Sequence, residues 1–369
     1  MKVALIGTSG YAGLYIQTLL DKHQKGEITL SNIVSIHYHS EGEIEGFKEK
    51  GIHFHNSLVG FFSEQREIDL LCIPTSIHSH FSIAKQGLDY GYNLLLEKPA
   101  AATPNQIQEL KKNAQAKGLK VLVGFQNLYE PETWEIKKKL VNGAIGKIES
   151  AHFLGLWPRS EEYFKRNEWA GKLSCNGEPV FDSVLHNAFA HFVNLLFFWT
   201  GIEIGAANAA VSVKGQLMRA NEIESFDMAS ISVETKNDVP MHINVSHTCG
   251  QNVDPRIRIE GSKSTLEWYG DYYILHGDKI AIEKDANSAI QRARNLMFNN
   301  VIELMNGADA DHCNLDLAYP VTHLIGLIHE NLRVETASYK SKRTEHGIQR
   351  VIEGIDEEMI KGFEQGSIT

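Results

Sequence analysis

A glycine-rich turn near the N-terminus separates a short apolar segment from an amphipathic one, an order that few folds accommodate. Residues 3–6 fit a buried strand, and residues 11–24 place apolar side chains along one side of a helix. The turn between them reads Gly7-Thr8-Ser9-Gly10-Tyr11-Ala12-Gly13. Small residues here permit a tight turn and let backbone N–H groups at a helix N-terminus approach a pyrophosphate. The sequence therefore predicts a dinucleotide-binding strand–turn–helix unit, with an ordinary glycine-rich turn as the alternative.

The details of this turn leave the choice of dinucleotide open. Gly7 and Ala12 fit the first and third small positions of the dinucleotide fingerprint, and Ser9 replaces the second glycine. The carboxylate expected about 20 residues downstream, on the ribose, is missing from the end of the second predicted strand. A 2′-phosphate could be accepted there instead, so NAD and NADP both stay open. The residues predicted to bind the dinucleotide in these two places are Gly7, Thr8, Ser9, Gly10, Tyr11, Ala12, His39 and Ser40.

The remaining pattern divides the chain in two. At about 150 residues per domain, 369 residues predict two domains. Short apolar strands alternate with amphipathic helices up to residue 125, which indicates a parallel sheet covered on both faces. The strands are predicted at 3–6, 33–37, 69–73, 93–96 and 120–125, and the helices at 11–24, 77–90 and 104–117. We expect an α/β fold, with an N-terminal Rossmann domain, a doubly wound parallel sheet, over residues 1–125.

Beyond residue 125, strands follow one another without intervening helices, which favours an antiparallel sheet. The strands are predicted at 148–156, 209–214, 228–234, 241–246, 256–260 and 265–269, with a hairpin turn at 261–264. The helices are predicted at 132–141, 181–199, 315–332 and 346–363. Residues 126–369 should thus form a C-terminal α+β domain with a mostly antiparallel open sheet, which binds substrate and forms oligomer contacts. For the last helices of this domain, packing back on the first domain is an open alternative.

Charge and composition exclude several classes of function. A net charge of −10 without a long basic run argues against a nucleic-acid binder, and Lys340 to Arg343 is expected to be a solvated helix end. The apolar run at 192–199 is far shorter than the roughly 20 residues that cross a bilayer. Four cysteines without CxxC spacing, and an N-terminal apolar stretch too short for a signal peptide, indicate a cytoplasmic protein. Seventeen histidines lack the spacing of a metal site, so no metal is expected.

Two further motifs follow predicted strands, at the strand ends where open α/β sheets bind ligands. One is Pro74-Thr75-Ser76-Ile77-His78, and the other is Glu97-Lys98-Pro99-Ala100. In this order they resemble the Gfo/Idh/MocA family, the glucose–fructose oxidoreductase and inositol dehydrogenase group. Residues 123–131 resemble that family's crossover into its second domain, and residues 143–148 resemble the entry to its sheet. The resemblance covers nearly the whole chain, although beyond about residue 200 it is only architectural.

The resemblance assigns roles to individual residues. It places Lys98 beside the nicotinamide and adds Pro74, Thr75, His78, Glu97 and Lys98 to the expected cofactor-binding residues. Whether the Lys98–Pro99 bond is cis is left open. It also implies a homo-oligomer, a dimer or a tetramer, formed through the sheet of the second domain.

The motif Asp182-Ser183-Val184-Leu185-His186 supplies the remaining catalytic candidates. On a helix, residues four apart share a face, so the carboxylate and the imidazole would meet there. The family carries Asp-x-x-x-His at the corresponding place, with the histidine transferring a proton and the aspartate supporting it. Val184 and Phe189 replace a glycine and an aspartate that are usual there, which leaves the substrate class open. The alternative is simply the polar face of an amphipathic helix.

Aromatic and polar residues alternate between Trp157 and Gly171 in a way that suits a polyol, because ring faces pack on sugar C–H edges. Arg159 and Arg166 are therefore expected to bind substrate, together with Lys98, Asp182 and His186. The alternative is a loop that its two tryptophans pack onto the second domain.

These observations predict an NAD(P)-dependent dehydrogenase that acts on a CH–OH group of a sugar, a sugar derivative or a cyclitol. His186 would accept the hydroxyl proton, Lys98 would polarise the oxygen, and Asp182 would orient His186 or bind a neighbouring hydroxyl. Three alternatives stay open: a non-catalytic NAD(P)-binding regulator of the same fold, a glycosidase that uses NAD transiently, and an acyl-phosphate reductase. The last is disfavoured because no cysteine lies in a nucleophile motif.

Overall fold

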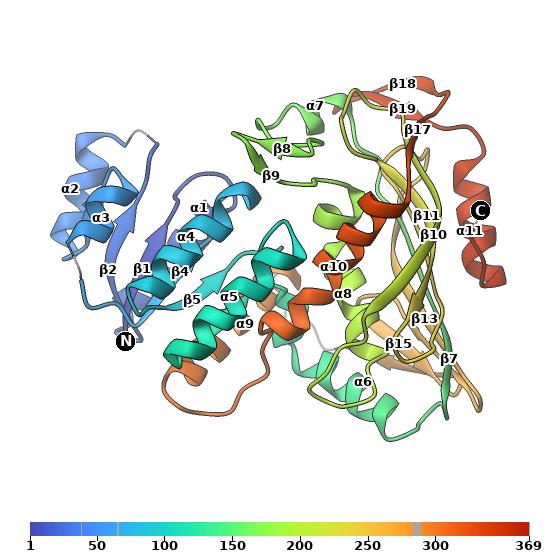
Figure 1. The fold of residues 1–369 in the computed structure, drawn as a ribbon, viewed down its shortest axis with the longest axis horizontal. Helices are drawn as coiled ribbons and strands as arrows, with labels where there is room; N and C mark the ends of the chain where they lie inside the picture. Colours follow the sequence, from blue (N-terminus) through green and yellow to red (C-terminus); the bar gives the residue numbers. More distant parts are fainter. Residues whose placement is uncertain (38, 65, 283–288, 369) are drawn as a thin grey trace. The chain divides into compact units, whose positions relative to one another are not determined.

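The computed structural model describes residues 1–37, 39–64, 66–282 and 289–368, which divide into two units (Figure 1). The first unit comprises Met1–Ala101, Asn105–Tyr129 and Ala293–Leu315. The second comprises Ala102–Pro104, Glu130–Arg292 and Asp316–Thr369. The chain thus leaves the first unit and later returns to it.

The first unit is built on a six-stranded sheet in the order β3-β2-β1-β4-β5-β6, with every neighbouring pair parallel. Its strands are β1 (Lys2–Ile6), β2 (Thr29–Val34), β3 (His53–His55), β4 (Leu70–Ile73), β5 (Asn93–Leu96) and β6 (Val121–Val123). The apolar run of β4 is buried throughout, as expected for a sheet covered on both faces. This order is the doubly wound Rossmann arrangement, so the predicted fold of the N-terminal half is confirmed.

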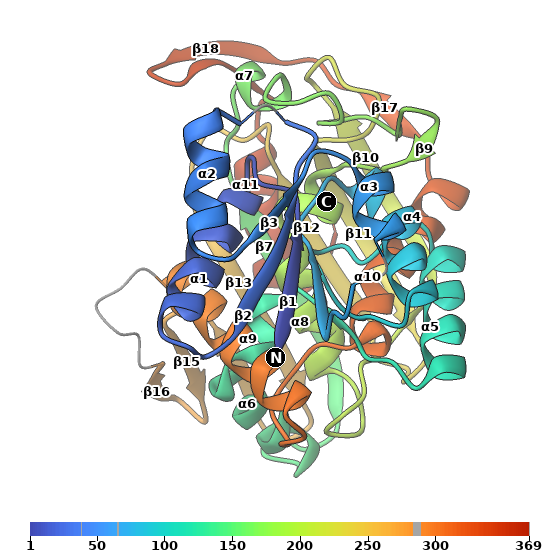
Figure 2. The ribbon, with the colours of Figure 1, turned by 90° about the vertical axis from the view of Figure 1, so that its left-hand side faces the viewer.

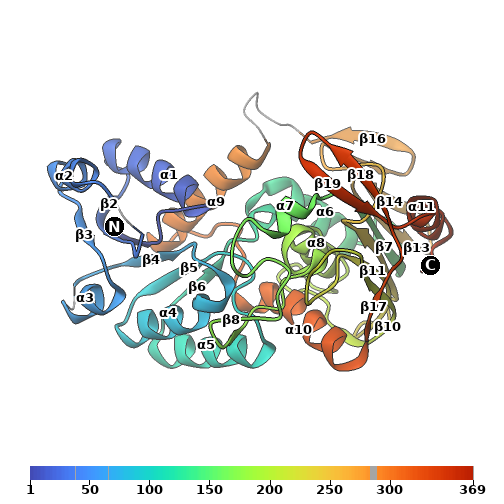
Figure 3. The same cartoon turned by 90° about the horizontal axis from the view of Figure 1, so that it is seen from above.

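Helices cover both faces of this sheet. Its helices are α1 (Ala12–Gln24), α2 (Glu41–Glu49), α3 (Leu58–Ser63), α4 (Ile77–Asp89), α5 (Pro104–Lys117) and the short η1 (Gln126–Tyr129). Helices α1 and α9 (Ala289–Met305) lie on one side, and α4 and α5 lie on the other (Figures 2 and 3). The second strand was predicted at residues 33–37 but ends at Val34, and Ile36 beyond it is 78% exposed.

The returning segment completes the core of the first unit. The ring of Phe298 packs edge-on against Tyr15, with centroids 4.9 Å apart, and both side chains are fully buried. Farther along, Val123 N–H donates to the carbonyl of Cys313 at 2.8 Å. Helix α9 was not predicted from the sequence, because its partner in the core lies more than 270 residues earlier in the chain.

The second unit contains a nine-stranded sheet in the order β16-β15-β14-β13-β7-β12-β11-β10-β17. Its strands are β7 (Ile148–Leu156), β10 (Ala210–Arg219), β11 (Met228–Thr235), β12 (Met241–Ser246), β13 (Val253–Gly261), β14 (Thr265–Trp268), β15 (Tyr272–Leu275), β16 (Asp278–Ala281) and β17 (Val334–Thr336). Only the pairs β7–β12 and β10–β17 are parallel in this sheet of described strands. The prediction of a mostly antiparallel sheet is confirmed, including the hairpin between β13 and β14.

This sheet is covered on both faces as well. Helices α6 (Pro131–Val141), α8 (Ala190–Trp199) and α10 (Leu315–Asn331) lie on one side, and α11 (Ile355–Gln365) lies on the other (Figures 1 and 3). The apolar side chains of α11 pack on a cluster of buried residues from β7 and β11, which includes Leu154, Leu156 and Met228. None of the helices in the described part of the chain is long and apolar enough to cross a membrane.

The helix predicted at residues 346–363 is wrong in its first half. Strands β18 (Lys340–Thr344) and β19 (Gly347–Val351) form an antiparallel hairpin there, so the expected helix end at Lys340 to Arg343 is also wrong. Gly347 adopts φ +106° in the hairpin turn, and Gly354 adopts φ +78° just before α11. Both are left-handed conformations that favour glycine and interrupt a helix.

Candidate active site

The glycine-rich turn lies between β1 and α1, at the carboxyl end of the parallel sheet. Gly7 and Gly10 adopt φ angles of +102° and +59°, which a residue with a Cβ atom rarely adopts. A Cβ atom on Gly7 would lie 3.4 Å from Thr75 Cγ2, in the loop after β4. Glycine therefore provides both the backbone conformation and the space that a bound pyrophosphate needs at this helix N-terminus.

The predicted residues at the end of β2 are tied to this turn and to α2. Thr8 Oγ1 lies 2.7 Å from Ser35 Oγ and 2.8 Å from His39 Nε2. The Ser40 hydroxyl accepts a bond from Glu43 N–H at 3.3 Å, and the Glu43 carboxylate accepts from Ser40 N–H at 2.8 Å. This reciprocal capping box begins α2, so Ser40 has a structural role that the sequence analysis did not assign to it.

Glu97 is the buried acid of the first unit. Its side chain accepts hydrogen bonds from Tyr15 Oη at 2.7 Å and from the backbone N–H of Lys98 at 3.0 Å. Burial raises the pKa of Glu97 to about 7, against the opposing effect of these donors. A Cβ atom on Gly124 would lie 2.8 Å from Glu97 Oε1, so the chain after β6 needs a glycine there. These contacts hold the residue that precedes Lys98 in one position.

His80 joins the two predicted strand-end motifs, a role that the sequence analysis missed. Its Nδ1 lies 2.8 Å from the carbonyl oxygen of Pro99, and its Nε2 lies 2.9 Å from that of Thr75. Burial lowers the pKa of His80, while the two carbonyls act in the opposite direction. His78 lies in the first turn of α4, and the Lys98–Pro99 bond is cis. In the sequence, the only indication of this role is that His80 lies two residues after His78, which was predicted to bind the cofactor.

In the second unit, the structure corrects the helical prediction for the Asp182 motif. Phe181 has φ +51°, and Ser183 is extended with φ −153° and ψ 171°. The π-helical turn Val184–Ala188 begins only after these residues, and α8 follows it. The Ser183 hydroxyl accepts the N–H of His186 at 3.1 Å, which explains why the helix cannot extend back through Asp182. Asp182 and His186 are therefore not neighbours on one helical face.

The environment of His186 nevertheless defines its tautomer. The side chain is fully buried, and Nδ1 lies 3.1 Å from the carbonyl oxygen of Phe181. A carbonyl can only accept, so Nδ1 carries the proton and the lone pair of the neutral ring is on Nε2. Asp182 is also buried, and its Oδ2 accepts the backbone N–H of Gly171 at 2.6 Å. The arrangement provides one nitrogen that can accept a proton and one carboxylate held by the backbone.

The aromatic segment after β7 packs onto the second unit through rings. Trp157 stacks on Phe189 with centroids 4.7 Å apart, and Phe189 stacks on His247 at 5.7 Å. The Nδ1 of His247 lies 2.8 Å from the carbonyl oxygen of Trp157, and burial lowers the pKa of His247 to about 3. This neutral histidine was not predicted, because its partner lies 90 residues away in the sequence. Trp157 is thus packed inward, as the alternative reading of this segment expected.

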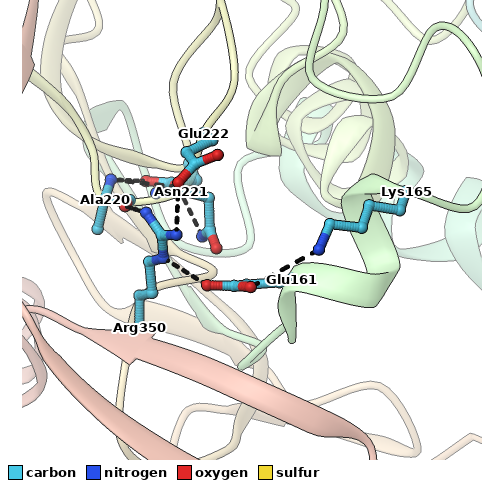
Figure 4. Close-up of polar contacts among 7 residues, drawn as sticks. Glu161, Lys165, Ala220, Asn221, Glu222 and Arg350 are labelled. Atoms are coloured by element: carbon cyan, nitrogen blue, oxygen red, sulfur yellow. Dashed lines mark hydrogen bonds and ion pairs between the residues drawn. The ribbon is translucent and has the colours of Figure 1, made fainter.

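A short helix in the same segment, α7 (Glu161–Phe164), is hydrogen-bonded to the β18–β19 hairpin (Figure 4). Arg350 on β19 donates to Glu161 at 2.8 Å, to the carbonyl of Ala220 at 2.9 Å and to Glu222 at 3.0 Å. Glu161 also pairs with Lys165, at 3.7 Å. The hairpin thereby fixes the position of the segment that carries Arg159 and Arg166.

The predicted site residues thus form two groups. The first unit holds the glycine turn, His39, Ser40, Pro74, Thr75, His78, Glu97 and Lys98. The second unit holds Arg159, Arg166, Asp182 and His186. In the part of the chain that the structure describes, no three metal-ligating side chains gather in a group that could hold a metal ion.

The first unit is a dinucleotide-binding domain, and the second is an α+β domain with a buried histidine and a buried carboxylate in the chain just before α8. The chain belongs to the GFO/IDH/MocA family of oxidoreductases. The family's N-terminal domain, described as "Oxidoreductase family, NAD-binding Rossmann fold", matches residues 1–125, and its C-terminal domain matches residues 133–267. The resemblance found in the sequence is confirmed.

Relatives of known name include both enzymes and a regulator. The inositol 2-dehydrogenase of Rhizobium meliloti is 22% identical over 204 residues, which cover 54% of this chain and 57% of that protein. The galactose/lactose metabolism regulatory protein GAL80 of Saccharomyces cerevisiae is 22% identical over 267 residues, 68% of this chain and 59% of that protein. The chain thus matches less than two thirds of each relative's length.

The fold is also shared with solved structures. The WlbA dehydrogenase from Bordetella pertussis, in complex with NADH and UDP-GlcNAcA, superposes with a TM-score of 0.71 at 21% identity. The match covers 89% of this chain and 95% of that one. At this identity the likeness establishes the fold.

Proposed function

We propose that this protein is an NAD(P)-dependent dehydrogenase that transfers a hydride between the nicotinamide and a CH–OH group of a sugar, a sugar derivative or a cyclitol. The observation that carries the proposal is the buried His186, whose Nδ1 is committed to a backbone carbonyl while Nε2 keeps the lone pair. An inositol dehydrogenase among the relatives and a dehydrogenase crystallised with NADH and a sugar nucleotide support this substrate class.

The residues of the first unit fit a dinucleotide. Gly7 and Gly10 leave the turn without Cβ atoms in left-handed conformations, so backbone N–H groups of the turn can face a pyrophosphate. Thr8, Ser9, Tyr11 and Ala12 complete the turn, and His39 and Ser40 lie at the end of β2, where the adenosine ribose binds in this fold. We propose that either NAD or NADP is held there. When bound, the nicotinamide supplies the hydride chemistry.

Residues of the chain itself would accept the hydroxyl proton and stabilise the charge on the alcohol oxygen. His186 would accept the hydroxyl proton at Nε2, since a neutral imidazole is a competent base near neutral pH. Lys98, whose backbone is held by Glu97, would donate hydrogen bonds to the alcohol oxygen and stabilise the charge that develops there. Asp182, fixed by Gly171 N–H, would orient His186 or bind a neighbouring hydroxyl.

Replacement of His186 by alanine tests the proposal. We expect kcat to fall by roughly 10²- to 10⁴-fold, because a general base is lost, while the Kd for the dinucleotide stays unchanged. The measurement is NADH formation from a panel of inositols, aldoses and their derivatives, together with calorimetric titration of NAD+. His53→Ala, an exposed histidine of the first unit, serves as the control. Unaltered turnover by the His186→Ala protein would exclude this role.

A regulator of the same fold is the second candidate, because GAL80 is among the relatives. A regulator would bind the dinucleotide but would exchange no hydride with any member of the panel. The wild-type titration and turnover assays described above separate these two functions.

The proposed homo-oligomer and cytoplasmic location can be measured separately, by sedimentation and by fractionation.

A further inference from the structure

Two guanidinium groups of the second unit stack on the same tyrosine ring. The Cζ atoms of Arg159 and Arg166 lie 5.0 and 3.8 Å from the ring centroid of Tyr163. Arg166 also donates to the carbonyl of Tyr163 at 2.6 Å, and its Cζ lies 5.4 Å from the ring of Trp169. Aromatic faces and a backbone carbonyl therefore position both cations.

The two carboxylates of the short helix α7, Glu161 and Glu162, have other partners. Glu161 pairs with Arg350 and Lys165 (Figure 4). Hydrogen bonds from its own backbone N–H, from Ser160 and from the backbone of Ile348 on β19 lower the pKa of Glu162, so that carboxylate also faces other donors. Among the residues that the structure describes, neither Arg159 nor Arg166 makes an ion pair. The contacts given for both guanidinium groups are aromatic rings and a backbone carbonyl, and cation–π contacts are weaker than charge-assisted bonds to a carboxylate or phosphate.

One donor of this pair is sealed from water. Arg159 Nε is buried, and no hydrogen-bond acceptor for it is found within the described residues. The neighbouring His247 ring, 5.7 Å from Tyr163, is fully buried, and its low pKa keeps it neutral. It therefore adds no charge to the pair and cannot act as a counterion. A buried donor without an acceptor is costly, and a ligand anion would satisfy it.

The pair also lies beside a proposed catalytic residue. The pKa of Tyr163 is raised by burial and by the Asp182 carboxylate, and lowered by Arg166 and Arg159. All three charges therefore act on one phenol within the second unit. Asp182 Oδ2 also accepts Gly171 N–H at 2.6 Å, so a substrate bound to Asp182 would lie against the segment that carries both arginines.

We propose that Arg159 and Arg166 bind an anionic substituent of the substrate, a carboxylate or a phosphate, and thereby select acidic sugars or cyclitols over neutral ones. This inference rests on the proposed dehydrogenase function and adds a substrate class to it. Arginine suits the role, because its planar fork donates paired hydrogen bonds to a carboxylate or phosphate. The Tyr163 ring contacts both guanidinium groups and so helps to position them.

Matched substrates test the proposal. With NAD+ or NADP+ in excess, kcat/KM is compared for glucose, glucuronate and glucose 6-phosphate, and for inositol and inositol phosphate. We expect the better anionic member to exceed its neutral partner by at least tenfold, and the two anions distinguish a carboxylate from a phosphate. Arg159→Met and Arg166→Met should each reduce this preference about tenfold, through KM of the anionic substrate rather than through kcat.

A matched control lies on the same segment. Lys165 is exposed and pairs with Glu161, so Lys165→Met removes one positive charge outside the tyrosine stack and should keep the preference. Melting temperatures of all variants check that they fold. A second readout does not need turnover: calorimetric titration of the dinucleotide-bound wild-type protein with glucuronate and with inorganic phosphate should show binding that both arginine variants lose.

The outcomes separate this inference from the function on which it rests. If neutral and anionic sugars react equally well and both arginine variants affect them equally, the anion site is refuted and the dehydrogenase stands. If no sugar is oxidised but the anions bind through the arginines, the dehydrogenase proposal fails and the anion site stands. Binding of anions that both variants retain would also overturn the inference.

Discussion

At the scale of single residues, Glu97 gives the clearest pH dependence. Its pKa of about 7 lies above the ordinary carboxyl value of 4.5, so the folded protein binds this proton more tightly than the unfolded chain does. The resulting contribution to stability is complete below pH 4.5 and is lost as the pH rises through 7. Burial is the cause, since water no longer solvates the charged form.

Glu97→Gln should remove that dependence. Between pH 4.5 and pH 8 we expect the difference in free energy of unfolding to shift by about 3 kcal/mol in favour of the variant, from the size of the pKa shift. Urea denaturation at several pH values measures it. Glu49→Gln, at an exposed position of α2, is the control. A difference that stays constant with pH would show that Glu97 titrates normally in the folded protein.

At the scale of elements, the end of α8 depends on a lysine from another helix. Lys137 of α6 is fully buried, and its Nζ donates to the carbonyls of Phe198, Gly201 and Ala206 at 2.6, 2.7 and 3.0 Å. The three hydrogens of the ammonium group thus match three carbonyls at and beyond the C-terminus of α8. Burial lowers the pKa of Lys137 to about 7, and its charged form lies at the favourable end of the helix dipole.

Lys137→Met should therefore destabilise the second unit strongly. Three carbonyls would lose their donor inside the protein, so we expect a loss of roughly 3 kcal/mol or more in the free energy of unfolding. Thermal and urea denaturation measure this loss. Lys138→Met changes the exposed neighbour on α6 and should cost little. Equal stability of the two variants would contradict the capping role.

Local sequence patterns predicted most of the helices and strands. They failed where a distant contact or a single backbone angle determines the secondary structure. The buried strand β4 and the helix α5 follow directly from apolar periodicity. The motif around His186 looked helical by spacing, but the Ser183 cap and the positive φ of Phe181 break the helix before it. The hairpin at residues 340–351 was missed because its strands are mostly polar and lie outside the large sheet.

At the scale of the whole molecule, α11 shields an apolar part of the large sheet. Met359 and Phe363 of this helix pack on Leu154, Leu156 and Met228. Deletion of residues 353–369 should expose that cluster and increase self-association or insolubility, because exposed apolar patches drive association. Sedimentation velocity of the shortened and the full chain measures it. An unchanged sedimentation profile would show that α11 is dispensable as a cover.

The candidate site was predicted in its residues rather than in its geometry. The glycine turn carries its own conformational requirement, so Gly7 and Gly10 could be identified from the sequence. The bond from Tyr15 to Glu97 and the contact of His80 with Pro99 join residues 82 and 19 positions apart. No local pattern encodes such pairs. The position of the segment that carries Arg159 and Arg166 likewise depends on the bond between Arg350 and Glu161, 189 positions apart.

The long excursion of the chain between Tyr129 and Ala293 has a consequence for biosynthesis. On the ribosome, the first six parallel strands emerge early, yet the ring that covers Tyr15 belongs to Phe298. Part of the apolar surface of the nascent first sheet therefore stays exposed while most of the large sheet, from β7 to β16, is translated. Domains usually complete their folding in order of synthesis, N-terminal first. Here the first domain to appear cannot be completed until most of the second unit has been made.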